Sequence, residues 1–388
     1  MKVSPLLSQI SPSLTLEITG KAKALKKEGV DIISFAAGEP DFDTPEHIRA
    51  AGIAAIEDGK TRYTPAKGMP ELIEAVREKF QRDNNLDYSA SSIVISCGAK
   101  HSLYNAFQAI CRDGDEVIIP SPYWVTYPEQ VRLAGAEPIF LDTVEEEGFR
   151  IDREKFTSAI TPRTRAIIVY SPSNPTGSAY SREDLEFIAE IALRNDIYLI
   201  SDEIYENLVY DGYQATSVAS LSQEVKDLTI VVNGVSKSYA MTGWRIGYLA
   251  APENVARAIS SFQSHSTSGP TTPSQYAALA ALSGDQSCVE EMRAAFEERR
   301  NLIIGRLNRI EGISCTMPKG AFYAFPNISA LGKPSLELAA ALLDEARIAV
   351  VPGIAFGADE NVRMSFADSL ENLNKGLDRM EKLVSSKR

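Results

Sequence analysis

Seven short apolar runs, spaced along the middle of the chain, constrain its fold more than any other feature. Stretches with the apolar spacing of helices separate most of these runs. Continuous apolar strands that alternate with helices are typical of a mostly parallel sheet covered on both faces. The pattern predicts an α/β fold with a seven-stranded sheet between helices, its strands near residues 92–96, 116–120, 138–141, 166–170, 198–202, 228–233 and 246–250.

The pattern changes near residue 290. Residues 290–311 are expected to form one long helix, residues 322–366 hold three short strand-like runs, and residues 369–384 have the spacing of an amphipathic helix. A helical stretch at residues 16–28 precedes the sheet region. We therefore expect a large domain at residues 45–290, and a smaller α+β domain formed by residues 1–44 and 291–388.

Composition excludes several classes of function. The net charge of −12 argues against a nucleic-acid partner, which needs a cationic surface. No apolar run reaches the ~18 residues of a membrane span, and the N-terminus has no clear secretion signal. Four scattered cysteines favour free thiols in a reducing compartment, and three distant histidines make a metal site or a Ser/His/Asp triad unexpected. We expect a cytoplasmic protein without metal, membrane or nucleic acid.

The segment Ser236–Arg245 carries the strongest chemical signal. Lys237 follows a small hydroxyl residue, and Arg245 comes eight positions later. A lysine that forms a Schiff base must be held close to a charged cofactor group, and an arginine can grip a phosphate with its planar fork. Most lysines are simply solvated, so Lys237 needs the support of neighbouring motifs.

Polar residues at the ends of two other strands give that support. Asp202 ends an apolar run, where ligands of parallel sheets bind, and a carboxylate there can hold a protonated heteroaromatic nitrogen. Tyr205 and Asn174 could both donate to a ring oxygen. Taken alone, Asp202 could equally cap a helix, Tyr205 could pack in the core, and the Asn174-Pro175-Thr176-Gly177 segment could be only a tight turn.

Two further strand ends could contact a flat, phosphorylated ligand. The Gly98-Ala99-Lys100 turn joins a strand to a helix, so its backbone N–H groups would face an anion at the helix N-terminus. Trp124 could stack on a planar ring, although a tryptophan is more often a core residue.

These motifs, in this order, resemble the class I/II aminotransferases of fold type I, which depend on pyridoxal phosphate, and in particular the aspartate aminotransferases of the bacterial and plastid branch. The resemblance runs nearly end to end. It is carried by segments 36–45, 62–64, 98–100, 121–124, 173–177, 201–205, 236–237 and 361–365.

The resemblance implies a role for each residue. Lys237 is the Schiff-base lysine and the base for proton transfer in a ping-pong reaction. Asp202 pairs with the ring nitrogen, Tyr205 and Asn174 bond the ring oxygen, and Trp124 stacks on the ring. Gly98, Ala99, Ser236 and Arg245 bind the phosphate, with Tyr63 from the partner subunit of a homodimer. Arg363 and the backbone of Gly38 bind the substrate α-carboxylate, with Trp124 and Asn174 nearby. By analogy, Ser121-Pro122 and Asn174-Pro175 are candidate cis peptide bonds.

The resemblance also implies a substrate pair, L-aspartate and 2-oxoglutarate. Lys100 matches the residue that meets the distal carboxylate, with Ser13 and Thr15 nearby; a lysine in a first helical turn is electrostatically unfavourable, which favours a ligand role. Relatives that use prephenate tend to have a basic residue where this chain has Ser11.

Several alternatives remain open at this stage. Prephenate, an aromatic amino acid or alanine could be the substrate, and a β-eliminating lyase would share the same cofactor residues. A non-enzymatic regulator on the same fold is disfavoured, because Lys237, Asp202 and Arg363 are all present.

Overall fold

The computed structural model describes residue 4 and residues 6–386. Helices and strands alternate through the middle of the chain, as the apolar runs predicted. The helices are α1 (Leu14–Lys27), α2 (Glu46–Glu57), α3 (Pro70–Asn84), α4 (Ala99–Ile110), α5 (Thr126–Leu133), α6 (Arg153–Ser158), α7 (Arg182–Asn195), α8 (Gln223–Lys226), α9 (Glu253–Ser264), α10 (Thr272–Ser283), α11 (Ser287–Leu307), α12 (Ser335–Ala346) and α13 (Leu370–Ser386). The strands are β1 (Ile33–Ser34), β2 (Ile93–Ser96), β3 (Glu116–Ser121), β4 (Glu137–Val144), β5 (Arg150–Ile151), β6 (Thr164–Tyr170), β7 (Tyr198–Asp202), β8 (Thr229–Gly234), β9 (Gly247–Ala250), β10 (Tyr323–Ala324), β11 (Ile348–Ala349), β12 (Val351–Pro352) and β13 (Val362–Ser365).

The main sheet has eight strands within the described residues, in the order β2-β9-β8-β7-β6-β3-β4-β5. Neighbouring strands from β8 through β4 run parallel, whereas β9 and β5 are antiparallel to their neighbours. The predicted α/β class is confirmed, but the expected count of seven strands was one too low. Strand β5 pairs only Arg150 and Ile151 with β4, and two residues are too few to show a strand period in the sequence.

Alternating side chains of these strands bury both faces of the sheet. Val94, Ala166 and Ile168 pack with α4, α5 and α9, whereas Ile167 and Val169, one position away, pack on the opposite face with α6 and α7. Successive side chains of a strand point to opposite faces, so a strand without polar residues must be covered twice. This explains why the runs were continuous rather than alternating.

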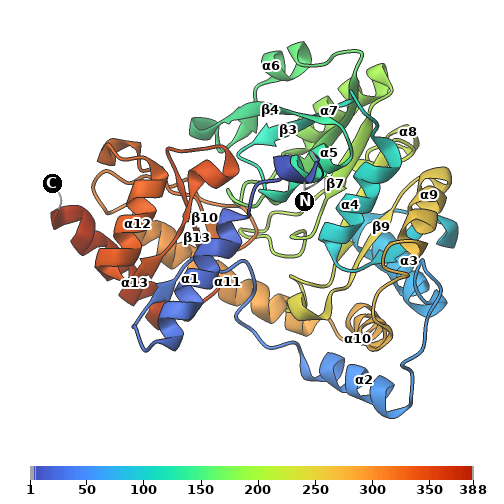
Figure 1. Ribbon diagram of the computed structural model, residues 1–388, viewed down its shortest axis with the longest axis horizontal. Coiled ribbons are helices and arrows are strands. Elements are labelled where there is room, and N and C mark those ends of the chain that lie inside the picture. The colour runs from blue at the N-terminus through green and yellow to red at the C-terminus, as the bar shows by residue number, and fades with distance from the viewer. Residues whose placement is uncertain (1–3, 5, 387–388) are drawn as a thin grey trace.

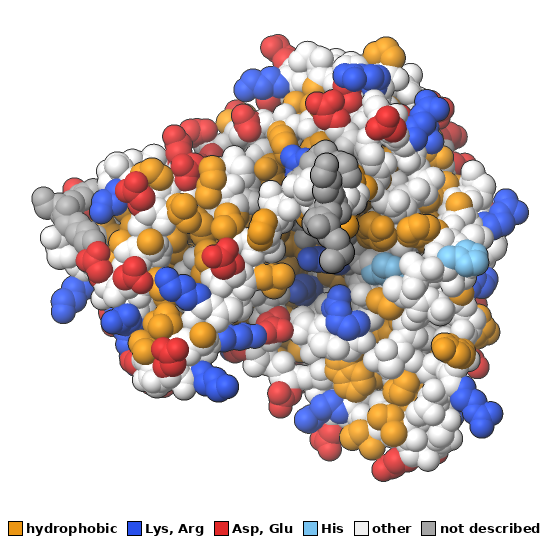
Figure 2. Space-filling model, in the orientation of Figure 1, with side chains coloured by type: hydrophobic (Ala, Val, Ile, Leu, Met, Phe, Trp, Pro, Cys, Tyr) orange, Lys and Arg blue, Asp and Glu red, His pale blue; other side chains and the backbone are white. Residues whose placement is uncertain are grey.

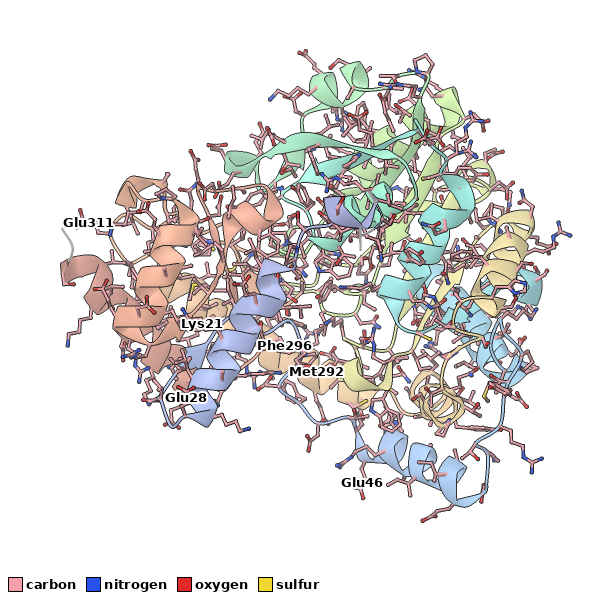
Figure 3. The ribbon with its side chains drawn as sticks, in the orientation of Figure 1. Lys21, Glu28, Glu46, Met292, Phe296 and Glu311 are labelled. Atoms are coloured by element: carbon pink, nitrogen blue, oxygen red, sulfur yellow. The ribbon has the colours of Figure 1, made fainter. Side chains whose placement is uncertain are left out.

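Helix α1, strand β1 and the C-terminal elements from α11 onward gather beside one end of this sheet (Figure 1). A three-stranded sheet, β10-β13-β12, and a two-stranded one, β1-β11, pack with α1, α11, α12 and α13. Met292 and Phe296 of α11 are buried in the apolar cluster of this part (Figure 3). Lys21 on α1, Glu28 just after α1 and Glu46 at the start of α2 lie along the segment in which the chain passes from this part to the large sheet (Figure 3).

Candidate active site

A cavity of about 470 Å³ lies between the carboxyl end of the main sheet and the C-terminal elements. Its lining includes residues from the loops after β3, β6, β7 and β8, because the carboxyl ends of parallel strands meet at one edge. The cavity brings together twelve of the residues that the sequence singled out: Thr15, Gly38, Ala99, Lys100, Trp124, Asn174, Asp202, Tyr205, Ser236, Lys237, Arg245 and Arg363.

Lys237 is half-buried in this cavity, three residues after β8 ends. Its Nζ donates a hydrogen bond to the backbone oxygen of Gly38, at 2.6 Å. Burial lowers the pKa of the amine to about 8, against the nearby Glu39 carboxylate, which raises it. A larger fraction of Lys237 is therefore neutral and nucleophilic near neutral pH than of an ordinary lysine.

Asp202 is the buried carboxylate of the cavity, 5% exposed at the end of β7. Its Oδ2 accepts from the Tyr127 hydroxyl at 2.9 Å, and its Oδ1 accepts from the Ile204 amide at 3.3 Å. Burial raises the pKa of Asp202 to about 6, while these two donors and the Lys237 amine lower it. A carboxylate in this setting can hold a cationic ring nitrogen at neutral pH.

Arg363 on β13 is 1% exposed. Its Nη1 donates to Asn174 Oδ1 at 2.9 Å and its Nη2 donates to the Ala36 backbone oxygen at 3.1 Å. Its buried Nε has no acceptor among the described residues. An unpaired buried donor of a guanidinium is costly, so this atom is available for an anionic ligand such as a carboxylate.

Gly98 forms a close contact with the Arg245 side chain at the start of α4. A Cβ at Gly98 would lie 2.3 Å from Arg245 Nη2, and the residue has a φ of +90°. Both the lack of space and the positive φ therefore require glycine at this position. Arg245 is exposed, and its Nη1 donates to the Thr242 backbone oxygen at 2.7 Å. The first amides of α4 have no partner within the helix, so they and Arg245 form a site for an anion.

Aromatic rings cover the remaining walls. Trp124 is half-buried, and Lys100 Nζ lies 4.8 Å from the centre of its ring. The Tyr205 hydroxyl lies 3.0 Å from that of Tyr323, whose ring stacks 4.5 Å below the Arg363 guanidinium. The side chains of Tyr205 and Tyr323 therefore connect the loop after β7 to the Arg363 guanidinium.

Three of the predicted residues lie outside the cavity lining. Gly98 adjoins the cavity through Arg245. Ser13 caps α1, where its Oγ accepts from the Leu16 amide at 3.5 Å. Tyr63 is 97% exposed and does not line this chain's own cavity. By contrast, Thr15 does line the cavity, and its buried Oγ1 has no hydrogen-bond partner in the described part of the chain.

One of the two expected cis peptide bonds was placed wrongly. Ser121-Pro122 is cis as predicted, but the second cis bond is Ser171-Pro172 and not Asn174-Pro175. The turn at Asn174 closes instead through a hydrogen bond from the Gly177 amide to the Ser173 oxygen, at 2.9 Å. Gly177 has a φ of +68°, a left-handed conformation that suits this turn.

Sequence reasoning missed Tyr127, Tyr323 and Glu39. Tyr127 follows Trp124 by three positions, but Trp124 precedes α5, so helix spacing gives no signal that would have found it. Glu39 lies at the cavity rim, where its carboxylate accepts from Thr242 Oγ1 at 3.0 Å and lies 4.0 Å from Lys23 Nζ. Nothing in the local sequence marks that contact.

The charge of the cavity differs from that of the whole chain. Five cationic side chains line it, against only two carboxylates, those of Glu39 and Asp202. Figure 2 shows Lys and Arg side chains facing the hollow between the two parts of the molecule. A pocket with this excess of positive charge favours ligands with several negative charges.

The described residues contain no group of three or more His, Cys, Asp or Glu side chains able to hold a metal ion. Within the same residues, every helix is too short or too polar to cross a lipid bilayer.

Comparison with known proteins identifies the family. Residues 30–380 match the family described as aminotransferase class I and II. The chain is 49% identical to the aspartate aminotransferase of Geobacillus stearothermophilus over 392 residues, covering 100% of both chains. It is 49% identical to a probable aspartate/prephenate aminotransferase of Aquifex aeolicus, covering 97% of each. The structure of Thermus thermophilus aspartate aminotransferase with maleate superposes with a TM-score of 0.95 at 44% identity, covering 99% of this chain and 100% of that one. The predicted family, fold class and cofactor are thereby confirmed, and the chain belongs to the class I and II aminotransferases, enzymes that use pyridoxal phosphate.

Proposed function

We propose that this protein transfers the amino group of L-aspartate to 2-oxoglutarate, with Lys237 as the lysine that bonds the cofactor. The observation that carries the proposal is the position of the half-buried Lys237 amine in one cavity with the buried Asp202 carboxylate and the unpaired Nε of Arg363. The names of the relatives support the substrate.

The cavity fits pyridoxal phosphate by its own chemistry. The Gly98–Arg245 contact and the first turn of α4 supply donors for a phosphate, and Asp202 supplies a carboxylate for a ring nitrogen. The Asn174 side-chain oxygen accepts a hydrogen bond from Arg363. The Nδ2 of Asn174 can therefore donate to a ring oxygen beside Tyr205. Ser236 completes the phosphate contacts and Trp124 covers the ring.

When bound, pyridoxal phosphate supplies an aldehyde that bonds primary amines and a ring that accepts electrons from the substrate Cα. The residues of the chain hold and orient the reactants around it. Arg363, with the Gly38 backbone, fixes the α-carboxylate of the substrate, so that the Cα proton faces Lys237. The Lys237 Nζ then takes and returns that proton, for which a pKa near neutrality is well suited.

Lys100 is proposed to bind the distal carboxylate, near Thr15 and Ser13. Its Nζ is held over the Trp124 ring, and the Thr15 Oγ1 lacks a partner within the described residues. The related Thermus enzyme has been solved with maleate, a dicarboxylate, which supports a site with two carboxylate-binding cations.

A half-reaction screen tests this function directly. Holoprotein is mixed with one amino acid at a time, and loss of the visible absorbance of the lysine-bound cofactor is followed. Aspartate and glutamate should react fastest. Lys100→Met should slow both at least about tenfold, ~1.4 kcal/mol, relative to alanine and phenylalanine. If Lys100→Met still prefers aspartate and glutamate to alanine and phenylalanine as the wild type does, Lys100 does not bind the distal carboxylate.

Prephenate is a second candidate substrate, because the Aquifex relative is named for both activities. The position that tends to be basic in prephenate-using relatives is Ser11 here, and its amide donates to Glu129 Oε2 at 3.3 Å. The same assay, run in reverse with the amino form of the cofactor and prephenate, decides between the two substrates.

We further propose a homodimer in which Tyr63 reaches the phosphate of the partner's site. The almost complete exposure of Tyr63 supports this proposal.

We also propose residues 45–290 as the cofactor domain and residues 1–44 with 291–388 as the small domain. Three apolar clusters confined to residues 48–289 support that division. All four cysteines are free, which supports a cytoplasmic location.

A further inference from the structure

In the wall of the cavity, Tyr127 and Asp202 form a buried pair. The Tyr127 hydroxyl lies 2.9 Å from Asp202 Oδ2; the tyrosine is 2% exposed and the aspartate 5%. The two residues come from α5 and β7, 75 positions apart in the chain. The pair is therefore produced by the tertiary structure and is independent of the motifs that named Asp202.

The direction of this hydrogen bond is settled by the two groups. Burial and the neighbouring carboxylate raise the pKa of Tyr127 well above 10, so its hydroxyl keeps its proton and donates. A donor to a buried carboxylate favours the charged form, and it lowers the pKa of Asp202 against the effect of burial. Without that donor, more of the Asp202 population would carry a proton at neutral pH.

Few other groups face Asp202. The Lys237 amine acts in the same direction as Tyr127, and the Ile204 amide donates to the other carboxylate oxygen. Glu203, the next residue, is turned away: its Oε1 accepts from Ser201 Oγ at 2.8 Å and from Ser217 Oγ at 2.6 Å. Tyr205 approaches from the loop after β7 with a neutral hydroxyl.

Packing holds Tyr127 in place. Its ring meets the edge of Trp124 at 5.4 Å between centroids and lies 5.3 Å from the ring of Tyr170. Because these aromatic neighbours are rigid, the Tyr127 hydroxyl can move little away from the Asp202 carboxylate. Within three positions of one another, Trp124 thus places an indole in the cavity and Tyr127 places a phenol against the Asp202 carboxylate.

We propose that Tyr127 is a positioning residue that keeps the Asp202 carboxylate charged and aimed, so that the ring nitrogen of bound pyridoxal phosphate, and not Asp202, carries the shared proton. The inference rests on the proposed function, because it requires Asp202 to face that nitrogen. The Tyr127 hydroxyl makes its hydrogen bond to Asp202, and its effect on the ring nitrogen passes through that carboxylate.

The test compares Tyr127→Phe with Tyr170→Phe. Both variants remove one buried hydroxyl from the same aromatic cluster and keep the ring. The Tyr170 hydroxyl donates to backbone oxygens, including that of Pro122 at 2.9 Å, and does not contact Asp202. Each protein is loaded with pyridoxal phosphate labelled with ¹⁵N in the ring, and the ¹⁵N NMR shift reports whether the nitrogen is protonated.

Tyr127→Phe should move the ¹⁵N resonance at neutral pH from the pyridinium position toward that of neutral pyridine, while Tyr170→Phe stays with the wild type. Affinity for the cofactor should fall about tenfold in Tyr127→Phe, the loss expected for one hydrogen bond to a charged group. Identical ¹⁵N shifts in all three proteins would overturn the inference. A neutral nitrogen in the wild type would instead contradict the proposed role of Asp202.

A second measurement needs no bound cofactor. The ¹³C-labelled carboxyl of Asp202 is titrated in each apoprotein, with Asp202→Asn to assign its resonance. The midpoint should lie near 6 in the wild type and rise in Tyr127→Phe only. An unchanged midpoint in a folded Tyr127→Phe apoprotein would refute the inference even if that variant binds cofactor poorly.

Discussion

At the scale of single residues, two groups of opposite charge, the Lys237 amine and the Glu39 carboxylate, decide the chemistry of this protein. The Lys237 amine is less basic than usual because burial penalises its charged form, and the Glu39 carboxylate at the rim partly restores it. The reactivity of Lys237 therefore depends on the Glu39 carboxylate at the cavity rim as well as on burial.

The pH dependence of cofactor uptake measures this balance. The neutral amine attacks the aldehyde, and its fraction grows as pH rises through about 8, so the rate of reconstitution of the apoprotein should rise across that range and then level off. Glu39→Gln removes the charge that raises the pKa, so its midpoint should move to lower pH and its rate at pH 7 should increase. Stopped-flow absorbance with pyridoxal phosphate gives both values.

The control for that experiment is Glu46→Gln, which removes an equal charge at the start of α2, away from the cavity. Its midpoint should match that of the wild type. A midpoint in Glu39→Gln that stays fixed or moves upward would show that Glu39 does not act on Lys237.

At the scale of elements, the junction of β2 and α4 is the most constrained part of the site. Gly98 has a positive φ and contacts the Arg245 side chain, and Gly247 leaves no space for a Cβ against the Ala99 backbone. A strand, a helix N-terminus and an arginine loop can meet this closely only where side chains are absent.

Gly98→Ala should therefore weaken binding of pyridoxal phosphate about tenfold or more, since the added Cβ displaces the Arg245 fork. Pyridoxal, which lacks the phosphate, should lose much less affinity. Fluorescence titration of the apoprotein with both compounds measures the difference.

Gly114→Ala serves as the matched control. Gly114 has a φ of +84°, close to that of Gly98, but no atom lies within 4 Å of its added Cβ. This variant should lose about 1–3 kcal/mol of unfolding free energy from backbone strain alone and bind both compounds normally. Equal losses of the two compounds in Gly98→Ala would place the phosphate elsewhere.

At the scale of the whole molecule, the cavity depends on elements from both ends of the chain. Thr15 and Lys23 on α1, Gly38 after β1, and Arg363 on β13 join the loops of the main sheet around it. Figure 1 shows these N- and C-terminal elements together on one side of the large sheet. The proposed dimer would add Tyr63 from a second copy.

Mixing two inactive variants tests that dimer. Tyr63→Ala lacks the residue proposed for the neighbouring site, and Lys237→Ala lacks the lysine proposed to bond the cofactor in its own site. In a mixed dimer, one site receives Lys237 from one chain and Tyr63 from the other. Activity should return to about a quarter of the wild-type value after random exchange of subunits.

Each variant exchanged with itself provides the baseline, and sedimentation confirms that subunits have mixed. Mixed dimers without recovered activity would rule out a shared site. Full activity of Tyr63→Ala on its own would show that Tyr63 does not contact the phosphate.

The order of residues along the chain by itself determined the fold class and most of the site residues. Seven apolar runs mark strands buried on both faces, and the polar residues that follow them, such as Asp202 and Lys237, must meet at one sheet edge. Short elements escaped this reasoning, because the two residues of β5 show no period and the turn at Asn174 could close with either proline geometry.

Only the tertiary structure decided the contacts that tune those residues. Tyr127 reaches Asp202 across 75 positions and Tyr323 reaches Tyr205 across 118, and both depend on the packing of separate elements. Local patterns record which face of an element is buried, but not which distant side chain is packed against it. Burial acts on both Asp202 and Lys237, Tyr127 acts on Asp202 and Glu39 acts on Lys237, so the tuning of the chemistry follows from the folded molecule.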